Sequence, residues 1–322
     1  MKRIRISIAA AMLFLSLLPY PVRAAQSLIP GGQVIGLQLE NETVTVAAFD
    51  DAIGGSAKQS GLQIGDVVLA INGIPVRCAE DVRNALHLAD DPISVTVSRK
   101  GKQHSFSLMP QDTADGKKLG IYLKQGISGI GTVTWYDPQR RMFGTLGHGV
   151  NDGKGQLAPM SRGQAFHAQV VSVKKGVCGA PGQLKGSAEN FTPWGTLLRN
   201  THQGVFGTTA ESFPGQAIPL AEYDQIRTGD ASIRCSVENN RVLEYSVEIM
   251  KIYPRDRSDG RNFLLHVTDA DLLAITGGIV QGMSGSPIIQ DGKLVGAVTH
   301  VLVNDPTRGY GIFIENMLEA AD

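Results

Sequence analysis

The sequence predicts a mainly β protein, with a small α/β domain followed by a larger β domain, behind an N-terminal export segment. Glycine accounts for 38 of the 322 residues, against an average of about 7%. Glycine favours tight turns over helices. Short apolar runs bounded by glycine and proline recur through the second half of the chain, which is typical of strands in a barrel or sandwich. The length is about twice that of a single domain of roughly 150 residues and so favours two domains.

Charge and cysteine usage narrow the class of function. The 30 Lys and Arg residues balance the 30 Asp and Glu residues, which argues against a nucleic-acid binder that works through bulk positive charge. The three cysteines are widely spaced, so they imply no disulfide framework, although a Cys178–Cys235 pair stays open. Neither CxxC nor HExxH occurs, so no zinc site of a familiar kind is expected.

Residues 1–25 have the pattern of an export signal. A basic start, Met1 to Arg5, precedes an apolar run of 13 residues from Ile6 to Leu18, and Val22-Arg23-Ala24 resembles a signal-peptidase site. The run is short for a membrane span of about 20 residues. We expect cleavage, with a retained membrane anchor as the alternative. In both cases the body of the protein lies outside the cytoplasm.

The first domain is expected over residues 28–110. The segment Gly61 to Val76 contains Gly65-Asp66, then an apolar strand, then Asn72-Gly73, a pair typical of hairpin turns with positive φ. The other expected elements are strands at Ile35 to Leu39, Thr43 to Ala48 and Ile93 to Ser98, and a helix at Ala79 to Ala89.

The pattern GLxxGDxxxxxNGxxV in this segment resembles that of PDZ domains. The resemblance implies a groove between a strand and the helix at 79–89, which accepts an extended peptide as an added strand. It also implies a carboxylate-binding loop at Gly32, Gln33, Val34, Ile35 and Gly36. The ligand would be the protein's own N-terminus or the terminus of a target. A PDZ fold that serves only as a rigid spacer is the alternative.

The second domain, residues 118–322, contains one turn with the composition of a catalytic nucleophile. Residues Gly282 to Pro287 have the sequence Gly-Met-Ser-Gly-Ser-Pro. Glycine lets the backbone bend so that the N–H groups of Gly282 and Ser284 point at one spot, as an oxyanion hole requires. An apolar hairpin follows. This run is similar to the nucleophile hairpin of chymotrypsin-like serine proteases; an ordinary Ser-Gly turn is the alternative. Substrate is expected to pair along Val298, Thr299 and His300.

A serine nucleophile needs a base. His148 lies between glycines shortly after the domain's first strand, and the chymotrypsin-like order places the histidine early and the serine late. His300 is the rival base, although we interpret it as a wall of the substrate cleft. The third member of a triad orients the histidine. Asp269, Asp271 and Asp305 are the candidates, and the residues alone do not choose among them.

The chain closely resembles the stage IV sporulation protein B (SpoIVB) peptidases of endospore-forming bacteria. The segments that carry the resemblance are 129–134, 144–149, 200–207 and, most specifically, 275–315. The order of export segment, PDZ domain and peptidase also matches. The resemblance implies a chymotrypsin-like double β-barrel and places the catalytic triad on His148, Asp269 and Ser284. Asp269 lies closer to the serine in sequence than the aspartate of chymotrypsin-like enzymes does, and Asp271 is the alternative.

The same resemblance implies a function. Such peptidases are exported, act between mother cell and forespore without a cofactor, and cut a membrane-associated regulator. That cut releases an intramembrane protease, which activates a late sigma factor. They also process themselves near the N-terminus, here between residues 25 and 60. A non-catalytic PDZ scaffold and a general extracytoplasmic quality-control protease are the alternatives.

Overall fold

The structure, a computed structural model, describes residues 27–87, 89–188, 192–257 and 259–322. The expected export segment therefore lies outside the described residues. Within those ranges, none of the helices combines the length and apolar character that a membrane span needs. All three cysteines lie in the described part and are free thiols, with Cys235 buried and Cys178 exposed.

The first of two β-barrels is assembled from strands that are far apart in sequence. Its strands pair in the ring β9-β10-β14-β13-β11-β2, and an additional pairing of β2 with β9 closes it. Buried apolar side chains fill it, among them Ile35, Val133, Phe143 and Trp194. The members are β2 (Val34–Phe49), β9 (Ile121–Asp137), β10 (Met142–Thr145), β11 (Arg162–Lys174), β13 (Gly195–Thr201) and β14 (Gly204–Thr208). Flanking strands are β1 (Ser27–Pro30), β12 (Gln183–Ala188) and β15 (Ile218–Pro219).

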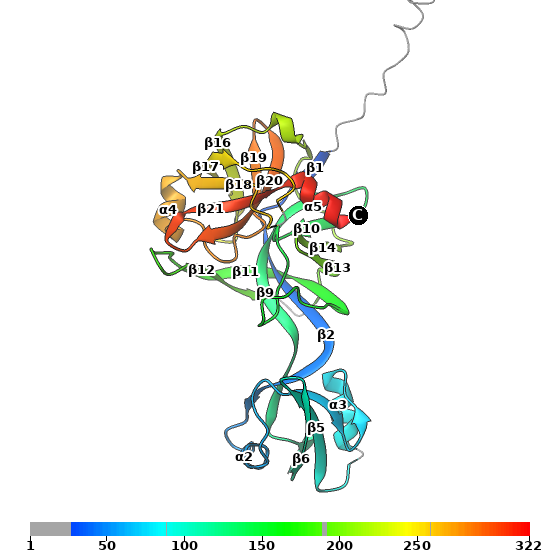
Figure 1. The fold of residues 1–322 in the computed structure, drawn as a ribbon. Coiled ribbons are helices and arrows are strands. Elements are labelled where there is room, and N and C mark those ends of the chain that lie inside the picture. Colours follow the sequence, from blue (N-terminus) through cyan, green and yellow to red (C-terminus); the bar gives the residue numbers. More distant parts are fainter. Residues whose placement is uncertain (1–26, 88, 189–191, 258) are drawn as a thin grey trace, which may run out of the picture.

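The second barrel is continuous in sequence and closed by its own strands, in the order β16-β17-β18-β21-β20-β19. Its members are β16 (Gly229–Cys235), β17 (Leu243–Ile252), β18 (Phe263–Val267), β19 (Pro287–Gln290), β20 (Lys293–Leu302) and β21 (Asp305–Phe313). The helices α4 (Ala270–Thr276) and α5 (Ile314–Ala321) and the short helix η1 (Tyr223–Gln225) lie outside the barrel wall. The predicted double β-barrel is confirmed (Figure 1).

The PDZ unit forms a separate lobe with its own core, which runs from Val44 to Leu123 in sequence. Asp66 is buried and paired with Arg99 at 2.7 Å, and Asn72 and Gly73 have φ values of 47° and 78°, as the hairpin turn requires. The elements are α2 (Gly55–Gln59), β3 (Val67–Ile71), β4 (Ile74–Pro75), α3 (Ala79–His87), β5 (Ile93–Arg99), β6 (Lys102–Leu108), β7 (Gln111–Thr113) and β8 (Gly116–Lys118).

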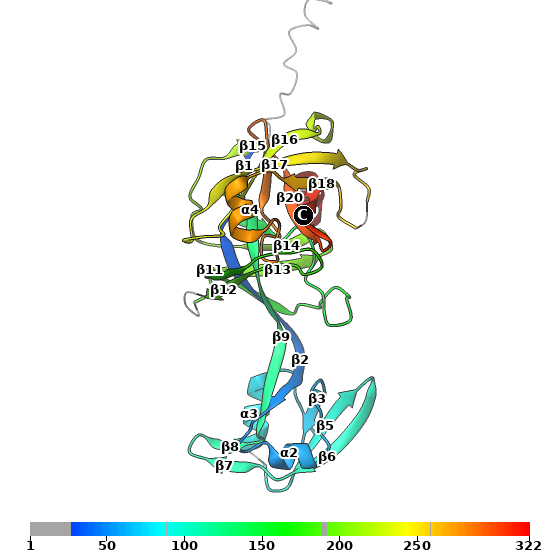
Figure 2. The same ribbon diagram turned by 90° about the vertical axis from the view of Figure 1, so that its left-hand side faces the viewer.

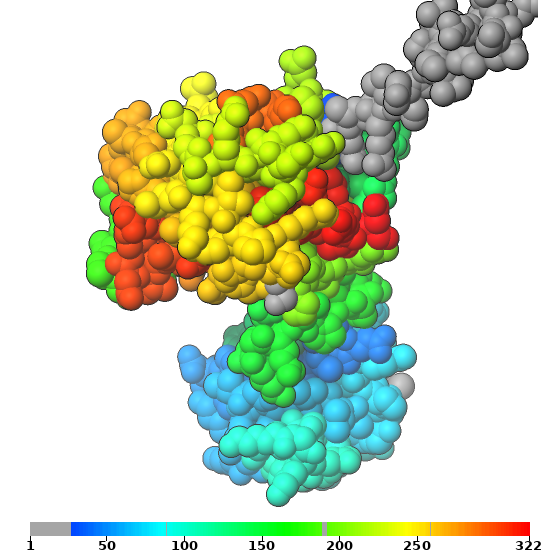
Figure 3. Space-filling model, turned by 45° about the horizontal axis from the view of Figure 1, so that its top comes forward, coloured from blue at the N-terminus to red at the C-terminus, as the bar shows by residue number. Residues whose placement is uncertain are grey.

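Two long strands join the PDZ lobe to the first barrel. The chain leaves the barrel along β2, forms the PDZ unit, and returns along β9, and the two strands pair over most of their length (Figure 2). The space-filling view shows the PDZ lobe beneath the two barrels (Figure 3). The PDZ unit is thus an insertion in the first barrel, which differs from the predicted division into residues 28–110 and 118–322. Residues 27 to about 40 belong to the first barrel and its flanking strand, and the start of β9 belongs to both units.

The predicted carboxylate-binding loop at residues 32–36 is not at the PDZ groove. Ile35 lies in β2 opposite His167 of β11 and Gly131 of β9, so both edges of the strand are occupied. Gly32 packs against Arg234 and Val242 of the second barrel. The polar triplet Glu40-Asn41-Glu42 suggested a break between two PDZ strands, but the structure continues β2 through it.

Candidate active site

A cleft of about 380 Å³ lies between the two barrels and is lined by two of the three predicted catalytic residues, Ser284 and His148. The first barrel contributes Ile130, Leu146 and His148, and the second contributes Ile279, Val280, Gln281, Gly282, Ser284, Thr299, His300 and Val301. Apart from the two histidines, no lining residue carries a titratable side chain. The cleft therefore offers an apolar wall on each side of a Ser–His pair.

We define residues Gln281–Ser286 as the nucleophile turn. Its first peptide group, which joins Gln281 to Gly282, directs the N–H of Gly282 toward this cleft. Leu184 N–H donates to the carbonyl of Gln281 at 2.8 Å. In a trans peptide the C=O and N–H point in opposite directions, so the N–H of Gly282 points away from Leu184. Within the described chain it has no acceptor.

The N–H of Ser284 is oriented in the same way. The carbonyl of Met283 accepts from the N–H of Ser286 at 2.9 Å and from its hydroxyl at 2.7 Å. The opposite end of that peptide, the N–H of Ser284, also has no acceptor in the described chain. Two unused donors thus flank the serine, as an oxyanion hole requires.

Glycine is required at the turn for steric reasons. Gly285 has φ of 98°, and a Cβ there would lie 2.0 Å from the carbonyl oxygen of Thr132 and 2.6 Å from the nitrogen of Leu146. Gly282 has φ of 99°, a region that side-chain-bearing residues rarely adopt. The glycine excess seen in the sequence therefore has specific steric causes here.

The hydroxyl of Ser284 donates to the carbonyl of Thr299 at 2.8 Å. Thr299 lies on β20 of the second barrel and also lines the cleft. In this state the serine proton is directed to a backbone oxygen rather than to the imidazole. Proton transfer to His148 therefore requires the hydroxyl to rotate.

His148 lies in the histidine turn, Thr145–Gly149, at the end of β10. Leu146 and Gly147 have φ values of 69° and 67°, which turns the chain sharply before the imidazole. Its Nδ1–H donates to the carbonyl of Gly149 at 2.9 Å. Because a carbonyl only accepts, this bond places the proton on Nδ1 and leaves Nε2 free to act as a base. Burial lowers the pKa of His148, while the bond to Gly149 opposes that shift.

His300 lies beside His148, with ring centroids 5.1 Å apart. Its buried Nδ1 has no hydrogen-bond partner in the described chain, and neither does the buried hydroxyl of Thr299. Burial, together with the charge on a protonated His148, lowers the pKa of His300 to about 4. Both histidines are therefore neutral near pH 7, and the cleft presents unpaired polar atoms beside the serine.

The three candidate aspartates are not brought to His148. Asp269 caps α4: its carboxylate accepts from the N–H of Leu272 at 2.9 Å and from that of Ser246 at 3.2 Å. Asp271 lies in the first turn of the same helix. Asp305 accepts from Thr307, which lowers its pKa. Among the described residues, none of these three carboxylates bonds to the His148 ring in this arrangement.

The predicted substrate-pairing residues differ in their availability. Thr299 and His300 line the cleft. Val298 is completely buried, and both its backbone groups are used, since its N–H donates to Ser286 and its carbonyl accepts from Gly285. Thr299 is itself only 2% exposed, so His300 is the one of the three residues with a partly exposed side chain.

A strand edge of the PDZ unit that no described strand covers lies at the start of β9, which sequence reasoning missed. Residues 121–125 pair with β2 on one side, and none of the described strands pairs with their other edge. Gly120 precedes them with φ of 66°, and a Cβ there would lie 2.3 Å from the carbonyl oxygen of Ile53. The sequence signal was Leu119-Gly120-Ile121, an apolar-Gly-apolar triplet after a turn.

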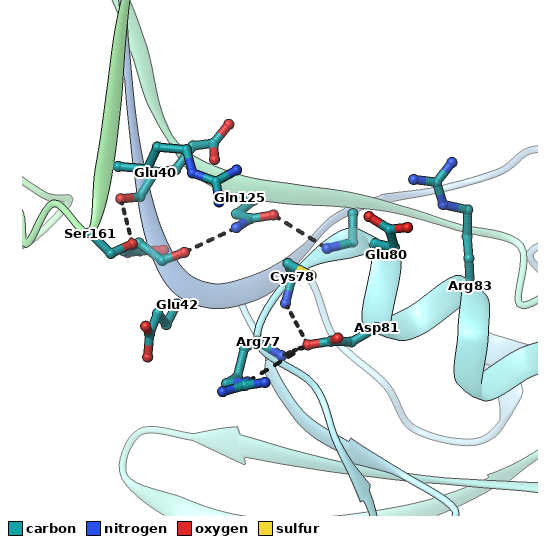
Figure 4. Close-up of a pocket in the computed structure, with 12 residues that line it drawn as sticks. Glu40, Glu42, Arg77, Cys78, Glu80, Asp81, Arg83, Gln125 and Ser161 are labelled. Carbon is teal, nitrogen blue, oxygen red and sulfur yellow. Dashed lines mark hydrogen bonds and ion pairs between the residues drawn. The ribbon is translucent and has the colours of Figure 1, made fainter. Parts of the chain in front are cut away.

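Gln125 connects this edge to α3 and to the bend in β2 (Figure 4). The side-chain oxygen of Gln125 accepts from the N–H of Ala79 at 3.3 Å, and its side-chain NH₂ donates to the backbone carbonyl of Asn41 at 3.2 Å. A polar hollow of about 490 Å³ opens at this junction. It lies at the PDZ lobe and is separate from the cleft that holds Ser284.

The double barrel with a serine turn and a histidine turn across one cleft is that of a serine peptidase. The chain belongs to the SpoIVB peptidase S55 family, whose model matches residues 115–318. A PDZ-domain model matches residues 52–99.

Comparisons with individual proteins are more distant. The curated relatives include a putative zinc metalloprotease of Vibrio cholerae, 32% identical over 146 residues, which are 45% of this chain and 30% of that protein. A second, from Rhizobium meliloti, is 31% identical over 100 residues, 31% of this chain and 26% of that protein. The chain thus spans less than a third of these relatives. In its described residues, no three His, Cys, Asp or Glu side chains are grouped as metal ligands.

Among solved structures, the chain is similar to the active form of the Rv3671c protease from M. tuberculosis. The TM-score is 0.37 and the identity 14%, over 61% of this chain and 73% of that one. It is also similar to the HtrA-type protease AlgW with a decapeptide, with a TM-score of 0.37 and 13% identity over 65% of this chain and 57% of that one.

Proposed function

We propose that the protein is an endopeptidase that cuts polypeptides through an acyl-enzyme on Ser284. The hydroxyl oxygen attacks the scissile carbonyl, and its proton passes to Nε2 of His148. The C–N bond then breaks as the leaving amine takes that proton. Water attacks the ester in the second half of the cycle, again with His148 as base. The N–H groups of Gly282 and Ser284 stabilise the negative oxygen formed in each half.

One observation carries this proposal: the N–H groups of Gly282 and Ser284 have no acceptor among the described residues, and the bonds to the adjacent carbonyls orient them. Donors held in this way remain available to a negative oxygen in the cleft, and each donor in such a hole contributes on the order of 10²–10³ in rate. The neutral His148, with Nε2 free, supplies the base. No step in this sequence calls on a cofactor.

We further propose the signalling role that the family suggests. The protein would be exported, would process itself between residues 25 and 60, and would cut a membrane-associated regulator between forespore and mother cell. That cut would release an intramembrane protease, which would activate a late sigma factor. The free edge at residues 121–125 would take a peptide terminus as an added strand, either the protein's own or the target's.

The test is labelling of the purified protein with a fluorophosphonate, followed by mass mapping. We expect one modified residue, Ser284, and no labelling or proteolysis by Ser284→Ala. Ser187→Ala, which removes an exposed serine on β12, should label as the wild type does. An unlabelled wild-type protein would favour the scaffold interpretation. Full sporulation with Ser284→Ala as the sole copy would contradict the signalling role.

A further inference from the structure

One residue of the first barrel bonds to both catalytic turns, and the proposed mechanism does not use it. Thr132, on β9, is completely buried. Its N–H donates to the carbonyl of Ser284 at 2.9 Å, and its hydroxyl donates to the carbonyl of Gly282 at 2.8 Å. Its own carbonyl accepts from the hydroxyl of Thr145 at 2.6 Å. Thr132 therefore joins the nucleophile turn of one barrel to the histidine turn of the other.

The bond to Gly282 fixes the peptide group that lies between the two oxyanion donors. This peptide joins Gly282 to Met283. The hydroxyl of Thr132 donates to the carbonyl of this peptide, and the N–H of the same peptide, which belongs to Met283, donates to the carbonyl of Val280 at 3.1 Å. Because successive peptide groups share a Cα, a rotation of this middle group would turn the N–H groups of Gly282 and Ser284 away from a common point. The glycine at 282, with no Cβ, offers little resistance of its own to such a rotation.

We propose that Thr132 is a positioning residue of the oxyanion hole, acting through its hydroxyl on the carbonyl of Gly282. The proposal rests on the proposed function of Ser284 as nucleophile. Without the hydroxyl, the carbonyl of Gly282 loses its hydrogen-bond donor. An unsatisfied buried acceptor costs free energy, so rotation of this peptide toward another donor becomes favourable. The transition state would then lose stabilisation, while the substrate, bound by the cleft walls, would not.

The same strand offers a matched control. Thr134 lies two residues further along β9 and is also completely buried, but its hydroxyl has no partner in the described chain. Replacing it with valine removes an unsatisfied polar group and leaves the shape unchanged. Thr132→Val and Thr134→Val thus make the same chemical change in the same strand, and only the first removes a bond to the nucleophile turn.

The experiment compares the full chain with Thr132→Val, Thr132→Ser and Thr134→Val. We expect Thr132→Val to slow fluorophosphonate labelling of Ser284 and kcat by about 10- to 100-fold, somewhat less than loss of a donor itself, with KM unchanged. Thr132→Ser, which keeps the hydroxyl, should restore both rates. Thr134→Val should match the wild type.

Other outcomes decide against the proposal. Wild-type labelling by Thr132→Val, equal slowing by Thr134→Val, or a rise in KM alone would overturn it while the nucleophile assignment stands. Should Thr132→Val fold poorly, Thr132→Ser and Thr132→Ala measured at a temperature where both are folded give the same comparison. An unlabelled wild-type protein would overturn the proposed function and this inference together.

Discussion

The nucleophile turn and the histidine turn face each other across one cleft but are organised to different degrees. In the nucleophile turn the carbonyls of Gln281, Gly282, Met283 and Ser284 all have hydrogen-bond donors. In the histidine turn, His148 is oriented by the carbonyl of the next residue, and no carboxylate of the described residues bonds to its ring. The groups that stabilise charge are in place, whereas the groups that move the proton are not yet connected.

This difference indicates which part of catalysis is built into the fold. Preorganised donors avoid the cost of reorganisation during the reaction, and here they depend on bonds between the barrels. The proton path requires the Ser284 hydroxyl to rotate from Thr299 toward His148, which is a change of side-chain torsion. A substrate strand entering beside Thr299 would compete for that carbonyl and release the hydroxyl.

The largest effect should come from breaking the organised half. Gly285→Ala would place a Cβ 2.0 Å from a backbone oxygen at φ of 98°, and backbone atoms cannot move aside cheaply. We expect the labelling rate of Ser284 to fall by at least about 10³-fold, the value for loss of a donor. Labelling kinetics, with circular dichroism to check the fold, measure this.

A control separates the steric effect from backbone strain. Gly292, in the hairpin after β19, also has positive φ, 73°, but a Cβ there would meet nothing within 4 Å. Gly292→Ala should cost about 1–2 kcal/mol of stability and leave labelling unchanged. If Gly285→Ala labels at the wild-type rate, the nucleophile turn is not held as tightly as its contacts indicate.

What the sequence predicts well is local. The Gly-x-Ser-Gly-x-Pro turn needs specific backbone angles, so Ser284 and the donors Gly282 and Ser284 were visible in six consecutive residues. His148 was visible because glycines frame it. Thr132 was not, because the bond that gives it importance joins residues 150 positions apart, and a threonine in a strand has no distinguishing pattern.

The insertion of the PDZ unit was missed for the same reason. It depends on Val34 pairing with Thr132 across nearly a hundred residues, and the polar triplet in β2 suggested a turn where the strand continues. Asp269 is different, since its alternative role was present in the sequence. An aspartate directly before an amphipathic segment is the standard signal of a helix N-cap.

The histidine pair gives a smaller, pH-dependent effect. Burial lowers the pKa of His148, and the base must be neutral, so the acid limb of kcat/KM should lie below the ordinary value of about 6.5. An acid limb at or above pH 6.5 would contradict the buried position of this ring. The profile should be measured on a substrate with no titrating group in this range.

The free energy of unfolding should also depend on pH, through the titration of His300. The pKa of His300 is lowered to about 4, with Arg261 lowering it and Asp259 raising it in smaller measure, so between pH 6.5 and 4 the unfolded chain binds more protons. Stability therefore falls as pH drops through that window. In Ser284→Ala, which prevents self-cleavage, His300→Gln should reduce this loss. If Ser284→Ala with and without His300→Gln shows the same pH dependence of thermal unfolding, His300 is not the group that lowers stability at acid pH.

The smallest effect is expected from changes at Asp269. This test matters most for the proton path, because it asks whether the carboxylate only caps α4 or also orients His148. Asparagine is as good an N-cap as aspartate, whereas alanine costs about 1 kcal/mol. If capping α4 is the role of this side chain, Asp269→Asn should label Ser284 within about twofold of the wild type, and Asp269→Ala should lose stability while staying active. Thermal unfolding and labelling rates distinguish these.

A folded Asp269→Asn that loses activity by more than about 10³-fold, toward the loss of about 10⁴-fold on replacing a triad aspartate by asparagine, would reverse the comparison. It would mean that the carboxylate leaves the helix cap to hold the His148 ring during catalysis, as the family resemblance implies. The proton path would then need a rearrangement of α4 as well as rotation of one hydroxyl. In that event Asp269→Glu, which weakens the cap but keeps the charge, should retain more activity than Asp269→Asn.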